Sequence, residues 1–197
     1  MSTPTGNTYD KYGTSNPIAR RMMAGFFSAL DELLGHEAPK RVLEIGAGEG
    51  EVADVVRERW PDAGYVAGDL WDPELLGHWG PRNLTGAAMD ATHLPFPDDS
   101  FDLVLAIEVL EHVTDPPAVL AELARVGSGR GVVSVPREPL WRALNMARGS
   151  YLGAFGNTPG HINHWGAKAF RELVQEHLAV TGEQRPVPWT MLAVRAP

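Results

Sequence analysis

The feature that most constrains the fold is a short apolar run that leads directly into glycines, RVLEIGAGEG at residues 41–50. A continuous apolar run of this length is typical of a strand buried on both faces of a parallel sheet. The glycines after it permit a tight turn and a close approach between ligand and backbone. The next segment, EVADVVRERW (51–60), has helical spacing, so its N-terminal amides point toward the same turn.

Strands and helices alternate along the rest of the chain, which predicts a doubly wound parallel sheet covered on both faces. Further strands are predicted at 65–70, 83–90, 101–110, 129–136 and 189–196, and helices at 17–34, 116–126 and 167–178. The stretch around 71–79 is expected to be irregular. We therefore predict one α/β domain over residues 1–197, Rossmann-like and mostly parallel, with an antiparallel terminal strand.

Composition excludes several classes of function. The chain has 17 Lys and Arg against 25 Asp and Glu, a net charge of -8, which argues against nucleic acid as the main partner. Cysteine is absent, so disulfides, thiolate metal sites and thiol catalysis are excluded. No apolar run reaches membrane-spanning length and the polar N-terminus lacks a signal-peptide core, so we expect a cytoplasmic protein without membrane insertion. Nothing in the sequence indicates an oligomeric state.

Acidic residues stand at the carboxyl ends of successive predicted strands. Glu44 precedes the glycines, Asp69 ends the second strand and Asp90 ends the third. Ligands of open α/β sheets bind at these strand ends. A carboxylate after the second strand is placed to accept hydrogen bonds from two ribose hydroxyls, and one after the third can accept from an exocyclic amine.

In combination, these segments resemble the class I S-adenosylmethionine-dependent methyltransferases. VLEIGAGEG resembles the family's glycine-rich motif, GDL its ribose-binding position, and MDATHLPFPDDSFDLVLAIEVLEHV its adenine-binding segment and fourth strand. A nicotinamide-binding Rossmann domain is the competing interpretation, which is disfavoured because Glu51 stands where G-x-G-x-x-G requires glycine. The cofactor residues that the resemblance implies are Glu44, Gly46, Ala47, Gly48, Asp69, Leu70, Asp90, Ala91, Ile107 and Glu108.

The resemblance implies in-line methyl transfer to a small-molecule acceptor, an O- or N-methylation of a metabolite or natural product. It divides the chain into an N-terminal arm and helix (1–35), a cofactor-binding core (41–136) and an acceptor-side insertion (137–166). A non-catalytic cofactor-binding or scaffolding protein with the same fold is the alternative. A general base is needed only for an acceptor that starts protonated.

The candidate bases are histidines near the predicted acceptor side: His112, His161 and His164. Glu108 or Glu111 could serve instead. Tyr9 and Tyr12 in the N-terminal arm resemble tyrosines with which related enzymes close over their ligands, although a frayed terminus explains them equally well.

The segment EVLEH (108–112) also resembles the E-x-x-E-H segment of two metal-binding branches, the ubiquinone-pathway O-methyltransferases and the small-RNA 2′-O-methyltransferases. The resemblance implies a divalent ion held by Glu108, Glu111, His112 and His161. Such ligands suit Mg, Mn, Zn or Fe without selecting among them. Many class I methyltransferases carry the same segment without a metal, so both interpretations stay open. No basic face supports an RNA substrate.

Overall fold

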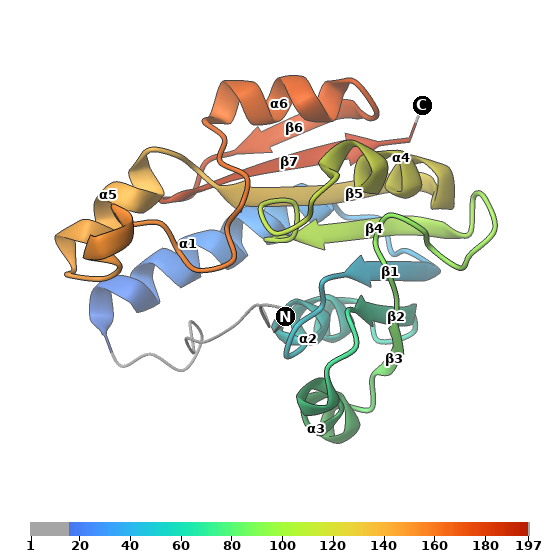
Figure 1. Cartoon of the computed structure of the whole chain (residues 1–197). Coiled ribbons are helices and arrows are strands. Elements are labelled where there is room, and N and C mark those ends of the chain that lie inside the picture. Colours follow the sequence, from blue (N-terminus) through green and yellow to red (C-terminus); the bar gives the residue numbers. More distant parts are fainter. Residues whose placement is uncertain (1–15, 197) are drawn as a thin grey trace.

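The computed structural model describes residues 16–196, except for the side chain of residue 76. Its centre is one seven-stranded sheet in the order β3-β2-β1-β4-β5-β7-β6 (Figure 1). The strands are β1 (Arg41–Ile45), β2 (Gly64–Asp69), β3 (Thr85–Ala88), β4 (Phe101–Ile107), β5 (Gly127–Pro136), β6 (Ala179–Gln184) and β7 (Trp189–Arg195). Strand β7 runs antiparallel to both of its neighbours, and the other pairs are parallel. The predicted sheet with an antiparallel terminal strand is confirmed.

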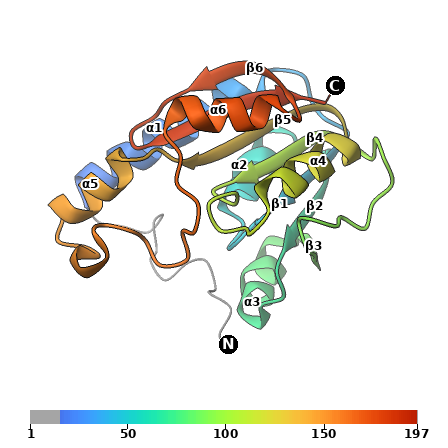
Figure 2. The same ribbon diagram turned by 45° about the horizontal axis from the view of Figure 1, so that its top comes forward.

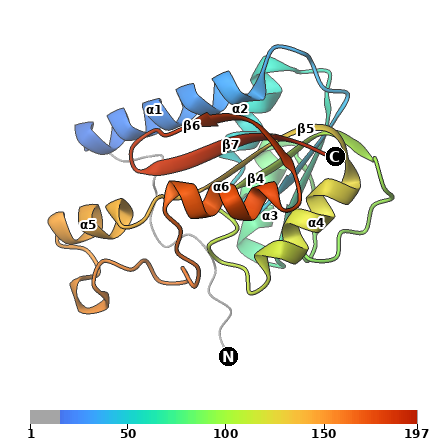
Figure 3. The ribbon, with the colours of Figure 1, turned by 90° about the horizontal axis from the view of Figure 1, so that it is seen from above.

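Helices cover both faces of this sheet, as predicted (Figures 2 and 3). They are α1 (Pro17–Leu34), α2 (Glu51–Arg59), α3 (Pro73–Arg82), α4 (Pro116–Val126), α5 (Leu140–Ala147), the 3-10 turn η1 (Leu152–Ala154) and α6 (Ala167–Gln175). Side chains alternate along β4, so Leu105 packs with α1 and α2 on one face while Val104 packs with α4 and α6 on the other. Among the described residues, no helix is long and apolar enough to cross a membrane.

Three elements differ from the sequence prediction. The expected irregular stretch contains α3, which begins where the Asp72 side chain accepts a hydrogen bond from the Glu74 amide at 2.9 Å and Pro73 supplies the first helical residue. Helix α5 forms within 137–166, where glycines and polar residues obscure its short apolar stripe. Strand β6 was not predicted because its residues, AVTGEQ, are largely polar and it pairs with β7 alone among the described strands.

Strand boundaries also differ at the sheet's carboxyl edge. Strand β3 covers only 85–88 rather than 83–90. Strand β4 ends at Ile107, because Glu108 has a left-handed φ of 60° that breaks the strand. The EVLEH segment is therefore a turn beyond the strand, in which Val109 and Leu110 pack into the core.

Candidate cofactor and acceptor site

A cavity of about 520 Å³ opens at the carboxyl ends of β1, β2 and β4. This is the edge of the sheet at which open α/β folds bind ligands. The cavity is lined by every residue that the sequence assigned to the cofactor: Glu44, Gly46, Ala47, Gly48, Asp69, Leu70, Asp90, Ala91, Ile107 and Glu108. The fold thus brings these residues together from four separate segments of the chain.

The glycine-rich turn forms one wall of the cavity through left-handed backbone conformations. Gly46 has a φ of 67° and Gly48 a φ of 51°, and Gly50, with a φ of 95°, begins α2. A Cβ atom on Gly46 would lie 2.3 Å from Cγ2 of Val109. Both the dihedral angle and the close contact therefore require glycine at residue 46.

Gly46→Ala is expected to lower the free energy of unfolding by at least about 2 kcal/mol, from left-handed strain and the contact with Val109. Urea denaturation of both proteins measures the difference. Gly77→Ala is the matched control, because its Cβ meets nothing within 4 Å and the residue lies in helix α3. The control should be neutral or slightly stabilising. Equal losses in the two variants would contradict this account of the turn.

Asp69 at the end of β2 links the glycine-rich turn to the second strand. Its carboxylate accepts hydrogen bonds from the backbone N–H of Gly48 at 2.8 Å and of Leu70 at 2.7 Å. Burial raises the pKa of Asp69, and the two amide bonds counteract this by favouring the charged form. The indole of Trp79 donates to the Gly48 carbonyl at 2.8 Å and holds the same turn from α3.

Glu44 is the deepest carboxyl group of the cavity wall. Its side chain is 1% exposed, and the Tyr65 hydroxyl donates to it at 2.5 Å. Burial is the main cause that raises the pKa of Glu44 to about 8, and the negative charges of Asp69, Glu51 and Asp54 raise it further. The Tyr65 hydrogen bond opposes the rise. Glu44 is consequently protonated near neutral pH.

The protonation of Glu44 predicts how stability depends on pH. The unfolded group loses its proton near 4.5 and the folded group near 8, so the folded chain binds more protons between these values. The contribution of Glu44 to the free energy of unfolding is fully present below about pH 4.5. It is lost as pH rises to about 8, at a rate of up to about 1.4 kcal/mol per pH unit. Urea denaturation of wild type and Glu44→Gln from pH 5 to 8.5 should show wild type losing stability relative to the variant. Parallel curves would refute this assignment.

At the outer rim, the segment after β3 presents Asp90 and Ala91. Asp90 is exposed, and its carboxylate accepts from the amide of Thr92 at 2.9 Å and from its hydroxyl at 2.7 Å. These two hydrogen bonds lower the pKa of Asp90, so its charge is maintained. The turn fixes Asp90 in the cavity lining.

The cavity lining is strongly acidic. Among the described lining residues there are eight carboxyl groups and no lysine or arginine. The eight are Glu44, Glu49, Glu51, Asp69, Asp72, Glu74, Asp90 and Glu108. Apart from the protonated Glu44, these carboxyl groups give the lining negative charge, which favours a ligand with positive charge and disfavours a purely anionic one.

Glu108 closes the end of the cavity that lies over β4 and β5. One carboxylate oxygen accepts from the Ser134 hydroxyl at 3.2 Å, and the other accepts from the Trp189 indole at 2.7 Å. Strands β5 and β7 therefore hold this side chain in place. Its φ of 60° is a left-handed conformation that is unfavourable for a residue with a side chain.

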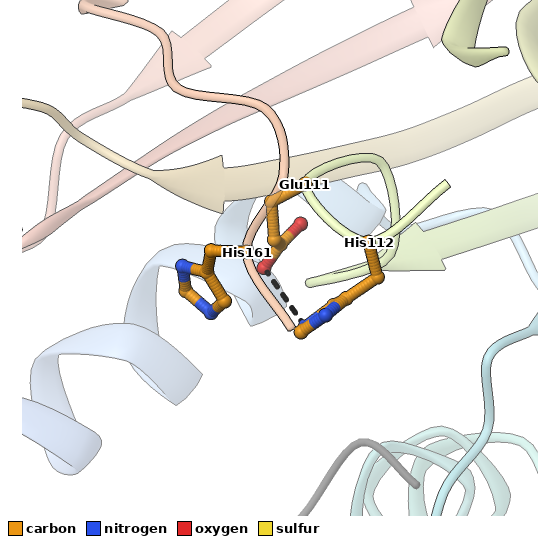
Figure 4. A group of neighbouring side chains, drawn as sticks. All are labelled: Glu111, His112 and His161. Atoms are coloured by element: carbon orange, nitrogen blue, oxygen red, sulfur yellow. Dashed lines mark ion pairs between the residues drawn. The ribbon is translucent and has the colours of Figure 1, made fainter. Parts of the chain in front are cut away.

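Beyond Glu108, three side chains converge from two distant segments: Glu111, His112 and His161 (Figure 4). Their potential ligand atoms all lie within 4.8 Å of one another, and Nε2 of His112 is 3.9 Å from a Glu111 oxygen. The rings of His112 and His161 meet edge to face at 4.8 Å between centroids. His112 lines the cavity, whereas Glu111 and His161 are buried behind it.

This cluster contains three of the four residues of the predicted metal set. Glu108 lies outside it, with its carboxylate directed to Ser134 and Trp189. One carboxylate and two imidazoles at these separations fit a divalent ion that has open positions for further ligands. Glu111, His112 and His161 are therefore the residues that lie close enough together to share one ion.

The remaining candidate site residues are not part of this cluster or lie outside the residues that the structure describes. His164 is exposed and its Nε2 contacts Oδ1 of Asn157 at 2.7 Å, so it is not part of the cluster. Tyr9 and Tyr12 lie outside the described residues.

Three residues that the sequence analysis did not single out hold parts of the site in place. They are Tyr65, which holds Glu44, Trp79, which holds the glycine-rich turn, and Trp189, which holds Glu108. In the sequence each of them is typical of an apolar core residue. In the structure the hydroxyl or indole N–H of each one also donates a hydrogen bond to the site.

Comparison with known proteins identifies the family. Residues 18–177 match the family model described as a methyltransferase domain, so the chain belongs to that family. It is 38% identical over 130 residues to a malonyl-[acyl-carrier protein] O-methyltransferase of Halorhodospira halophila, covering 63% of this chain and 43% of the relative. It is 34% identical over 140 residues to a demethylmenaquinone methyltransferase of Roseiflexus castenholzii, covering 66% and 59%.

A solved structure shows the same fold at greater sequence distance. The N-methyltransferase NodS of Bradyrhizobium japonicum, in complex with S-adenosyl-L-homocysteine, superimposes with a TM-score of 0.63 at 18% identity. The match covers 93% of this chain and 89% of NodS. The chain spans about half the length of the curated relatives that it matches, between 38% and 60%.

Proposed function

We propose that this protein transfers the methyl group of S-adenosylmethionine to an oxygen or nitrogen atom of a small-molecule acceptor. One observation carries the proposal: all ten residues that the sequence assigned to this cofactor line one acidic cavity. The cofactor bears a sulfonium and an ammonium group, whose positive charges suit that lining. The membership of the methyltransferase family and the S-adenosyl-L-homocysteine held by NodS support the same ligand.

In this proposal the cavity residues bind the parts of the cofactor in order. Asp69 accepts from the ribose hydroxyls, and Asp90 with the Ala91 amide binds the adenine. The methionine portion lies along Gly46, Gly48 and the Glu44 carboxyl group. Glu108, held by Trp189, marks the end at which the reactive methyl faces the acceptor. The cofactor supplies the methyl chemistry, and the protein aligns the acceptor and excludes water.

His112 is the base that we propose for a protonated acceptor. The acceptor atom attacks the methyl carbon with its lone pair, the carbon–sulfur bond breaks with its electrons passing to sulfur, and Nε2 of His112 takes the proton. The Glu111 carboxylate, 3.9 Å from that nitrogen, stabilises the resulting imidazolium. His161 packs against the His112 ring and keeps it oriented.

A divalent ion is a second way to activate the acceptor, and the cluster of Glu111, His112 and His161 favours it as a candidate. The ion would lower the pKa of a bound acceptor hydroxyl. Protein as purified, assayed before and after treatment with EDTA, distinguishes the two. Loss of activity restored by Mg²⁺ or Mn²⁺ supports the metal, and full activity in EDTA supports His112 as a base.

The decisive assay is transfer of an isotopically labelled methyl group. The protein is incubated with labelled S-adenosylmethionine and a panel of acceptors: demethylmenaquinone in oxidised and reduced form, malonyl-[acyl-carrier protein] and a metabolite extract. The first two are chosen because they stand in the names of two relatives. Label in a small molecule, lost in the Asp69→Ala variant, is expected. A folded protein that binds the cofactor but labels nothing supports the alternative of a non-catalytic cofactor-binding protein.

A further inference from the structure

Two segments almost fifty residues apart are joined by hydrogen bonds beside the cavity. They are the turn after β4, residues 108–113, and the loop at 157–165 that leads into α6. The Glu111 carbonyl accepts from the amides of Ile162 at 2.9 Å and Asn163 at 3.1 Å. The Asn163 side chain adds two more bonds, donating to the carbonyls of Leu110 at 3.0 Å and Val113 at 2.7 Å. We call this set of four bonds the Asn163 clamp.

The Gly160 carbonyl lies close to the clamp and to His112. Gly160 is three residues before Asn163 and lines the cavity, and its oxygen lies 3.0 Å from Nδ1 of His112. A carbonyl oxygen can only accept, so Nδ1 must carry the proton of the neutral ring. The other nitrogen, Nε2, is then the unprotonated one, and it lies 3.9 Å from a Glu111 oxygen.

We propose that Asn163 is a positioning residue: its clamp holds Gly160 against His112 and so fixes the Nδ1–H tautomer. This inference rests on the proposed function for its catalytic meaning, since a lone pair on Nε2 is what a base or a metal ligand requires. The tautomer itself is a property of the folded chain and does not depend on cofactor, acceptor or metal.

The side-chain amide of Asn163 suits the clamp because one group can donate two hydrogen bonds. Its NH₂ group has two donors, and the clamp uses both on carbonyls at either end of one turn. Leu110 and Val113 lie outside the strands and helices, in the turn after β4. Alanine at 163 would remove both donors and leave only the two backbone bonds to Glu111.

The test is the ¹⁵N spectrum of His112 in protein labelled with ¹⁵N-histidine, treated with EDTA and measured at a pH where the ring is neutral. A His112→Gln spectrum identifies the signals. Wild type is expected to show a protonated Nδ1 and an unprotonated Nε2. Asn163→Ala is expected to shift the ring largely to the Nε2–H form, which predominates in imidazole without a structural partner. Asn163→Gln, which keeps the amide, should retain part of the wild-type signature.

Asn16→Ala is the matched control. Asn16 caps α1 by accepting from the Ile18 amide at 2.9 Å, so its loss lowers stability without touching the site. It should leave the His112 tautomer unchanged. An Nε2–H ring in wild type, or an unchanged Nδ1–H ring in folded Asn163→Ala, would overturn the proposal.

The same variants separate this inference from the proposed function. Asn163→Ala is expected to lower kcat roughly 10- to 100-fold while changing affinity for S-adenosylmethionine less than about threefold, because the base and not the cofactor loses its position. A wild-type protein that shows the Nδ1–H tautomer but transfers no methyl group contradicts the proposed function and leaves the clamp intact.

Discussion

Asp69→Ala is expected to weaken binding of S-adenosylmethionine roughly 100-fold or more, measured by isothermal titration. Two effects add in this variant. The proposed bonds between the carboxylate and the ribose hydroxyls are lost, and hydrogen bonds to a charged group contribute about 1.5–3 kcal/mol each. The anchor that Asp69 provides to the amides of Gly48 and Leu70 is lost as well. Asp69→Asn, which keeps the shape but loses the charge, should fall between wild type and Asp69→Ala.

The matched control for this variant is Asp62→Ala. Asp62 is exposed and is not among the residues lining the cavity, so it removes the same negative charge at a distance from the ligand. It should bind the cofactor like wild type. If folded Asp69→Ala bound like wild type too, the assignment of the cavity to this cofactor would be wrong.

His112→Gln is expected to lower kcat by about two to three orders of magnitude, the usual contribution of a positioned general base. Glutamine fills similar space without accepting a proton. The cofactor's proposed contacts lie on other residues, so affinity for S-adenosylmethionine should change less than about threefold. The measurement is steady-state kinetics with the acceptor identified by methyl labelling.

A histidine away from the cavity provides the comparison for His112→Gln. His177 follows α6 and is not part of the Glu111, His112 and His161 cluster. His177→Gln should retain wild-type kcat. A small effect of His112→Gln combined with full sensitivity to EDTA would transfer the activating role from the imidazole to a bound ion.

The sheet and the cofactor cavity could be predicted because they depend on local patterns. Strands β1, β2 and β4 are short, largely apolar runs, and they lead into Gly46, Asp69 and Glu108 at one edge of the sheet. The ten predicted residues line one cavity for this reason. Helix α3 was missed although Asp72 and Pro73 form a regular helix start, because two glycines and Pro81 follow within ten residues.

The acceptor side could be predicted less well, because it depends on contacts between distant segments. No local pattern indicates that Glu108 turns away toward Trp189, 81 residues later. Nor does the sequence show that Asn163 reaches back to Leu110 and Val113. Such bonds depend on tertiary packing. They determine that Glu111 and His112 lie in the cluster with His161 while Glu108 does not.

The most direct test of the central claim is a crystal structure of the protein with S-adenosyl-L-homocysteine. The account predicts the ribose on Asp69, the adenine beside Asp90 and Ala91, and the sulfur directed toward Glu108 and His112. A product bound outside this cavity, or lying within it with its adenine against Gly46, would contradict the account.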